Sequence, residues 1–342
     1  MGSGRGGAEH KRGRKDRSMN HLRVSGIRAV AVGALAMGVM LSGCVGKRQQ
    51  QNAAAPRKPR VALVMKSLAN EFFKTMEEGA RNHQRQHPDQ YDLIAQGIQD
   101  ERDVNRQHDL VQQMIAQKVD AIVIAPADSK AMVGVSKEAM DAGIVVVNID
   151  NKFDADTLTQ EGVSIPFVGP DNRKGARLAA EYLARKLRPG DKVAIVEGIP
   201  TAFNALMRKR GFEDAMKAAG MVIVDSQSAH WETSEAEKVV SGMISRHADL
   251  KAVLCANDSM ALGAVAALRS AGRLDDVLVV GFDNISAAHE YMNEGAILCT
   301  VDQHADQIAV EGITYALDIL KGAARPQDKE TMVDLVTARA TE

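Results

Sequence analysis

Several residue types and catalytic patterns are scarce or absent in this chain of 342 residues. It has three cysteines, a single tryptophan and a formal net charge of −1, which gives no indication of a nucleic-acid-binding surface. No spacing of cysteine and histidine is typical of a metal site. The sequence also lacks the Gly-x-Ser-x-Gly, Walker A and His-Glu-x-x-His motifs. We therefore expect no enzyme, no cofactor and no nucleic-acid partner.

An apolar run near the N-terminus is too short to cross a membrane. The run from Ala29 to Leu41 falls well below the ~20 apolar residues of a membrane-spanning helix. Basic residues precede it and Leu41-Ser42-Gly43-Cys44 follows it, so residues 1–44 are interpreted as a signal peptide with an N-terminal extension. The last four residues resemble the bacterial lipobox, which would make Cys44 the lipidated first residue of the mature protein. An ordinary leader with a chance cysteine is the alternative.

Residues 45–59 separate this leader from the rest of the chain. They are rich in Gln, Ala and Pro and show no apolar periodicity, which predicts a flexible tether. Only Cys255 and Cys299 lie beyond the tether, each within an apolar run. We expect buried free thiols there, because a chain of this length does not need a disulfide to fold. A disulfide between them is the alternative.

From residue 60 onward, short apolar runs alternate with amphipathic stretches, the βαβ pattern of parallel sheets covered on both faces. The pattern predicts an α/β fold of two doubly wound parallel-sheet lobes. A last helix, near 304–321, and a last strand, near 331–336, remain after two complete series, which predicts a multi-crossing hinge between the lobes. Lobe 1 is expected to comprise residues 60–170 plus about 304–332, and lobe 2 residues 171–303 plus about 333–342.

Polar residues end several of the predicted strands. Asp150 follows Val-Val-Val-Asn-Ile, Asn257 follows Val-Leu-Cys-Ala, and Asp283 follows Val-Leu-Val-Val-Gly-Phe. Ligands of open α/β sheets bind outside the carboxyl ends of the strands, where such side chains converge. Carboxylates, arginine, amides and flat aromatic faces together suit a polyhydroxylated ligand. The sequence therefore predicts a small-molecule site at this edge.

Two longer motifs carry a family resemblance. They are Asn70-Glu71-Phe72-Phe73 and Arg208-Lys-Arg-Gly-Phe212. With the strand-end residues, they make about residues 60–342 similar to the ribose-binding class of periplasmic sugar-binding proteins, which feed ABC importers. The resemblance implies two α/β domains joined by three hinge crossings, with the ligand between them. It implies the following ligand contacts: Asn70, Phe72, Phe73, Asp150, Arg208, Trp231, Asn257, Asp283 and Gln303.

Plain structural roles are the alternatives for some of these residues. Asn70 is typical of a helix N-cap before two core aromatic residues, and Asp258, next to Asn257, is typical of a cap on the following helix. Asp150 and Asp283 could each be turn residues that close a strand.

Two positions depart from the ribose-binding pattern. Ala125 stands where those proteins have Asn, and Asn151 stands where they have Arg, although we still count Asn151 among the expected contacts. The pocket should therefore be roomier and less cationic, which favours a hexose or polyol, with ribose an open alternative. Asp128 could supply a compensating carboxylate, or it could cap a helix.

The expected function is that of an exported, periplasmic or extracytoplasmic lipoprotein, monomeric and held to a membrane by its lipid. It would capture a monosaccharide or polyol by hinge closure and deliver it to an ABC permease. A secreted glycoside hydrolase using Asp150 and Asp283 is one alternative, and a sugar-sensing partner of a chemoreceptor or kinase is another. The effector-binding half of a lactose-repressor-type regulator is less compatible with the sequence, because a leader is found where such a regulator has its helix-turn-helix.

Overall fold

The alternating pattern of the chain folds into two sheets in the computed structural model, which describes residues 57–323 and 327–338. The expected signal peptide, Cys44 and all but the last three residues of the tether lie outside these ranges. Within the described ranges, no helix is long and apolar enough to cross a membrane. All described residues belong to one compact unit, residues 54–342.

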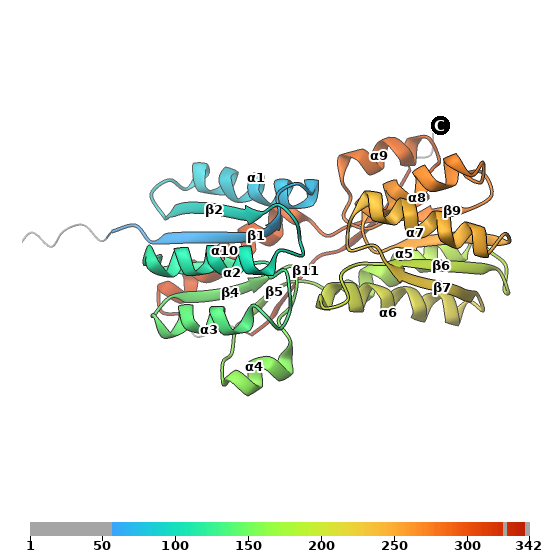
Figure 1. The fold of residues 1–342 in the computed structure, drawn as a ribbon. Coiled ribbons are helices and arrows are strands. Elements are labelled where there is room, and N and C mark those ends of the chain that lie inside the picture. The colour runs from blue at the N-terminus through green and yellow to red at the C-terminus, as the bar shows by residue number, and fades with distance from the viewer. Residues whose placement is uncertain (1–56, 324–326, 339–342) are drawn as a thin grey trace, which may run out of the picture. The chain divides into compact units, whose positions relative to one another are not determined.

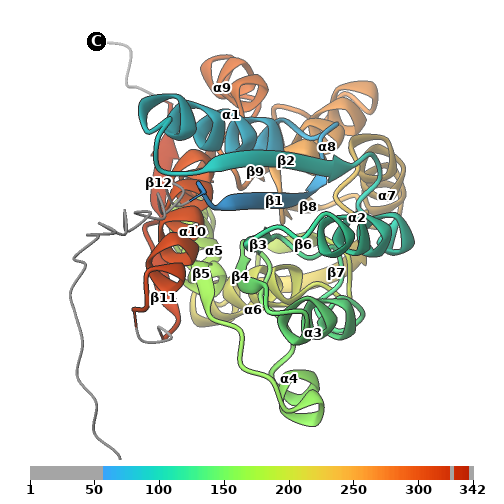
Figure 2. The same cartoon turned by 90° about the vertical axis from the view of Figure 1, so that its left-hand side faces the viewer.

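Lobe 1 is built on a six-stranded parallel sheet (Figure 1). Strand β1 reads Arg-Val-Ala-Leu-Val-Met-Lys-Ser and is buried on both faces, as expected for a central strand of a covered parallel sheet. Helices α1 and α10 cover one face and α2 and α3 the other (Figure 2). In sheet order the strands are β11 (Lys329–Thr331), β5 (Phe167–Pro170), β4 (Val145–Ile149), β3 (Ala121–Ile124), β1 (Arg60–Ser67) and β2 (Asp92–Ile98). The helices are α1 (Glu71–Gln86), α2 (Val104–Ala116), α3 (Val133–Asp141), α4 (Ala155–Glu161) and α10 (Ala305–Leu320).

Lobe 2 repeats this plan with one difference. Its edge strand β12 runs antiparallel to β10, whereas the other neighbours are parallel. Helix α5 packs against α6, and α7 packs against α8. In sheet order the strands are β12 (Asp334–Thr337), β10 (Cys299–Asp302), β9 (Leu278–Val280), β8 (Leu250–Cys255), β6 (Lys192–Glu197) and β7 (Val222–Ser228). The helices are α5 (Asn172–Ala184), α6 (Phe203–Ala218), α7 (Thr233–Arg246), α8 (Asp258–Ser270) and α9 (Ser286–Asn293).

Three segments of the chain pass between the lobes. They lie between β5 and α5, between β10 and α10, and between β11 and β12. In each sheet the order of the strands reverses beside the first strand, β1 in lobe 1 and β6 in lobe 2. Such reversal points are where doubly wound sheets bind ligands. The predicted fold class, two parallel-sheet α/β lobes, is confirmed.

Two elements differ from the sequence-based expectation. The last predicted strand is two strands, β11 and β12, which pair with different sheets. Helix α4 was not expected, because none of its seven residues is buried and it has no apolar period. It is held instead by its ends: Asp154 accepts a hydrogen bond from the Thr157 amide, and Gly162 closes the helix in the left-handed conformation.

The two cysteines of lobe 2 are free and buried, which confirms the expected thiols. Burial raises the pKa of Cys299 to about 12 and also raises the pKa of Cys255. Neither sulfur is therefore an activated nucleophile.

Candidate ligand-binding site

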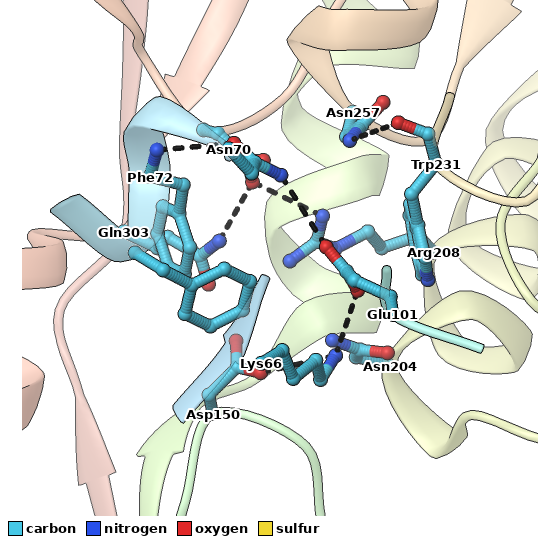
Figure 3. A pocket seen from close by; sticks show the side chains of 12 residues that line it. Lys66, Asn70, Phe72, Glu101, Asp150, Asn204, Arg208, Trp231, Asn257 and Gln303 are labelled. Atoms are coloured by element: carbon cyan, nitrogen blue, oxygen red, sulfur yellow. Dashed lines mark hydrogen bonds and ion pairs between the residues drawn. The ribbon is translucent and has the colours of Figure 1, made fainter. Parts of the chain in front are cut away.

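A cavity lies between the carboxyl-end loops of the two sheets (Figure 3). Its volume is about 20 Å³, which is room for about one water molecule. Its wall combines charged, amide and aromatic side chains from both lobes. The twelve lining residues are Lys66, Asn70, Phe72, Phe73, Glu101, Asp150, Asn204, Arg208, Trp231, Asn257, Asp283 and Gln303. Among the described residues, no group of three or more His, Cys, Asp or Glu side chains could hold a metal ion.

Three of these residues occupy backbone conformations that non-glycine residues rarely adopt. The φ angles are +59° for Asp150, +72° for Trp231 and +119° for Asp283. Each follows a strand or sits in a strand-to-helix loop, so the chain turns sharply at the point where the side chain enters the cavity. Such strained residues cluster at functional sites because the surrounding structure must hold them there.

Arg208 and Asp283 form the charged centre of the lobe 2 wall. The guanidinium donates from Nε to Asn172 Oδ1 at 2.7 Å, and from Nη1 to the Ala256 carbonyl at 2.8 Å and to Asp283 Oδ1 at 3.1 Å. Gln303 Nε2 donates to the same Asp283 oxygen at 2.7 Å. Burial raises the pKa of Asp283, and the neighbouring Arg208 opposes that shift. Arg208 is therefore held in place by groups of lobe 2 alone.

Lys66 forms the corresponding centre of lobe 1. Its Nζ lies 3.3 Å from Asp150 Oδ2 and 3.6 Å from Glu101 Oε2, and all three side chains are buried. Glu101 Oε1 also accepts from Asn70 Nδ2 at 3.4 Å. Burial raises the pKa of Glu101, and the Lys66 charge acts against it. This buried cation between two carboxylates was not anticipated from the sequence.

Aromatic rings cover the cavity from both lobes. Phe72 and Phe73 pack edge to face, with centroids 5.1 Å apart, and Trp231 approaches from lobe 2. Lys66 Nζ lies 5.6 Å from the Phe73 ring and 5.9 Å from the Trp231 ring. The Trp231 ring packs on Gly198, where an added Cβ would lie 2.1 Å from the ring. Gly198 is therefore needed for the position of the indole.

Three buried polar atoms on the cavity wall have no hydrogen-bond partner in the part of the chain that the structure describes. They are Asp150 Oδ2, which has only its ion pair with Lys66, and Trp231 Nε1 and Gln303 Oε1. Buried polar groups without partners cost free energy. Two acceptors and one donor thus face a space in which a ligand could satisfy them.

Nine of the ten predicted contacts line this cavity; the exception is Asn151. Asn151 is buried behind the wall, where its Nδ2 donates to the Pro126 carbonyl at 2.9 Å. Asp128 does not compensate, because its Oδ1 accepts from the Lys130 and Ala131 amides in a turn. The predicted cap role of Asp258 was wrong: Asn257 caps α8 by accepting from the Met260 amide. Asn257 and Asn70 thus both cap a helix and line the cavity.

The sequence reasoning missed Lys66, Glu101 and Asn204. For Lys66 a signal was present, since a lysine that continues a fully buried strand needs a partner. Glu101 lies in a polar loop after β2, and Asn204 lies in the first turn of α6. Their local sequence does not distinguish them from surface residues.

Comparison with known proteins identifies the family of this chain. A family model described as "Periplasmic binding protein domain" matches residues 61–324. The chain belongs to this family of periplasmic binding proteins. The periplasmic binding protein described here is 53% identical over 318 residues to the D-ribose/D-allose-binding protein of Pseudomonas aeruginosa, an alignment that covers 91% of this chain and all of that one.

Two solved structures resemble this periplasmic binding protein closely. A solute-binding protein of an ABC transporter from Burkholderia multivorans, with an unknown ligand represented as alpha-D-erythrofuranose, is 55% identical, with a TM-score of 0.81 and coverage of 82% of this chain and 100% of that chain. A periplasmic solute-binding protein from Actinobacillus succinogenes with bound D-allose is 36% identical, with a TM-score of 0.78 and coverage of 82% of this chain and 98% of that chain. By name, these relatives are binding proteins rather than enzymes.

Proposed function

We propose that this protein captures a monosaccharide or related polyol in the cavity between its lobes and delivers it to an ABC permease. D-ribose and D-allose are the first candidates. The observation that carries the proposal is the cavity wall, where both lobes present polar atoms without hydrogen-bond partners, and aromatic faces, to one shared space. The relative that binds D-ribose and D-allose and the neighbour with bound D-allose support it.

The wall suits hydroxyl groups, because each hydroxyl donates one hydrogen bond and accepts others. Asp150 Oδ2 and Gln303 Oε1 would accept from ligand hydroxyls, and Trp231 Nε1 would donate to a ligand oxygen. Hydrogen bonds to charged groups contribute ~1.5–3 kcal/mol each. The faces of Phe72 and Trp231 would cover the apolar C–H surfaces of the ring.

Three further polar groups of the cavity wall favour a ligand with more hydroxyls than ribose. Lys66 and Glu101 of lobe 1 and Asn204 of lobe 2 add donors and acceptors beyond the contacts implied by the ribose-binding resemblance. A hexose such as D-allose could use one more of them than a pentose can. We therefore expect D-allose to bind at least as tightly as D-ribose.

Capture would proceed by hinge closure. The three crossing segments leave from one edge of each sheet, where β11 and β5 lie in lobe 1 and β12 and β10 in lobe 2, an arrangement typical of hinged binding proteins. A ligand that contacts both lobes stabilises the closed form relative to the open one, and so shifts the population. The reaction is binding alone, with no bond made or broken.

The cellular setting is proposed from the N-terminal sequence. A signal peptide cleaved directly before Cys44 would export the protein, and lipidation of Cys44 would hold it to a membrane in the periplasm or its extracytoplasmic equivalent. The tether of residues 45–59 would let the folded part, a monomer, reach the permease.

Calorimetry and thermal unfolding with D-ribose, D-allose, D-glucose and myo-inositol test the proposal. A ligand present at a hundred times its dissociation constant stabilises the folded protein by ~2.7 kcal/mol. We expect such stabilisation with D-allose or D-ribose and one bound sugar per protein. No binding across the panel would overturn the proposal, and so would release of sugar products from labelled oligosaccharides at catalytic rates.

A further inference from the structure

Three helices of lobe 2, α6, α7 and α9, begin without a capping hydrogen bond from the side chain of their own N-cap residue. Ala202 precedes α6 and Ile285 precedes α9, and neither residue has a polar side chain that could accept a hydrogen bond. Helix α8 of the same lobe shows the usual arrangement, because Asn257 caps it. The first amides of a helix need acceptors from elsewhere when its N-cap residue supplies none.

For α6 these acceptors come from lobe 1. The Phe203 amide donates to Ser129 Oγ at 2.9 Å, and the Asn204 amide donates to Asn151 Oδ1 at 3.1 Å. Ser129 Oγ also donates to Asn151 Oδ1 at 3.3 Å. The bond from Asn151 Nδ2 to the Pro126 carbonyl turns the amide oxygen toward α6. Ser129 and Asn151 thus form a prepared pair of acceptors that matches two successive amides.

For α9 the acceptor is also a lobe 1 side chain. The Ser286 amide, the first of the helix, donates to Glu71 Oε1 at 2.7 Å. A carboxylate is the most favourable acceptor at this position, because the helix dipole places partial positive charge there. Two separate helix ends of lobe 2 are therefore completed by lobe 1 residues that are sequence neighbours of the cavity wall: Glu71 precedes Phe72, and Asn151 follows Asp150.

We infer that Glu71, Ser129 and Asn151 are helix caps that act across the two lobes and set the lifetime of the closed, sugar-bound state. The inference rests on the proposed function, because the caps form only when the lobes close. Separation of the lobes would return the amides of α6 and α9 to water, so each cap adds to the stability of the closed form alone. The caps also hold α6, and with it the cavity residues Asn204 and Arg208, in place. They are positioning residues: Asn151 acts through a helix end rather than on the ligand.

The test measures sugar release from variants of the full chain. Glu71→Ala removes the acceptor at α9, Ser129→Ala removes one of the two acceptors at α6, and the double variant removes both of these. Glu71→Gln keeps an acceptor oxygen at the same place, and Glu78→Ala removes an exposed carboxylate of the same helix as a matched control. Stopped-flow dissociation of D-allose or D-ribose, equilibrium titration and ligand-free thermal unfolding are recorded for every variant.

Loss of one cap should speed release about fivefold and weaken binding by the same factor, in line with measured losses of helix caps. The double variant should reach roughly 25-fold, because the two helix ends are independent. Glu71→Gln and Glu78→Ala should stay within about twofold of the unmodified protein. Glu71→Ala and Glu71→Gln should unfold alike without ligand, since both lose the same charge.

Two results would overturn the inference while leaving the proposed function intact. In the first, the variants Glu71→Ala, Ser129→Ala and the double variant all bind sugar and release it at rates within twofold of the unmodified protein. In the second, these variants lose as much stability toward thermal unfolding without sugar as with it, which would mean that the caps do not depend on closure. If the unmodified protein binds no sugar at all, the proposed function fails and the inference falls with it.

Discussion

Replacement of Lys66 by methionine tests the charge balance of the cavity. Methionine keeps most of the length of the side chain but removes the cation that lies 3.3 Å from Asp150 and 3.6 Å from Glu101. Two buried carboxylates would then face each other without a partner. Removal of one member of a buried ion pair costs ~3–5 kcal/mol, so Lys66→Met should lose about that much stability at pH 7.

The loss should depend on pH in a defined direction. Burial already raises the pKa of Glu101, and without Lys66 that pKa rises further. A carboxyl group whose pKa is raised by folding contributes stability that is fully present below its unfolded pKa of about 4 and disappears as the pH rises through the folded pKa. The deficit of Lys66→Met should therefore be small near pH 4 and largest near pH 7.

Urea unfolding at both pH values measures this deficit directly. Lys74→Met, at an exposed position of α1, is the matched control and should change the free energy of unfolding by no more than about 0.5 kcal/mol. If Lys66→Met is as stable as the unmodified protein at pH 7, or if its deficit is the same at both pH values, the description of this buried cluster is wrong.

Three further predictions concern groups around the cavity. Burial raises the pKa of Asp258 from 3.8 to about 6. The contribution of Asp258 to the free energy of unfolding is therefore complete below pH 4 and falls by about 3 kcal/mol as the pH rises past 6. The free energy of unfolding should depend less on pH in Asp258→Asn, and an unchanged pH profile would contradict this. Gly198→Ala should weaken sugar binding at least tenfold in calorimetry, because its Cβ displaces the Trp231 ring, whereas Gly134→Ala, with nothing within 4 Å, should not. Trp231→Phe keeps a ring but loses Nε1, so its affinity for the sugar should fall about three- to tenfold. An affinity equal to that of the unmodified protein would mean that the indole N–H does not donate to the ligand.

The sequence was most informative about the strands and the residues at their ends. Buried strands with polar ends predicted the two sheets and placed Asp150 and Asp283 at the carboxyl ends of strands, where ligands bind. The family resemblance added Arg208, Trp231 and Gln303, which no local pattern indicates. These residues come from different segments of the chain, and only the fold brings them to one cavity.

The rest depended on contacts that a linear sequence does not contain. Asn151 was expected to contact the ligand, and only the approach of α6 shows that its Oδ1 instead accepts from the Asn204 amide. Glu101 lies in a loop whose polar composition is typical of a surface, yet it is buried against Lys66. Helix α4 has no apolar face to reveal it.

A crystal structure of the protein with D-allose, repeated with D-ribose, tests the central claim most directly. The account predicts one sugar between Phe72 and Trp231, with its oxygens within hydrogen-bond distance of Asp150 Oδ2, Trp231 Nε1 and Gln303 Oε1, the three atoms that have no hydrogen-bond partner among the described residues. A sugar bound elsewhere, or a sugar in the cavity that makes no hydrogen bond to those three atoms, would contradict it.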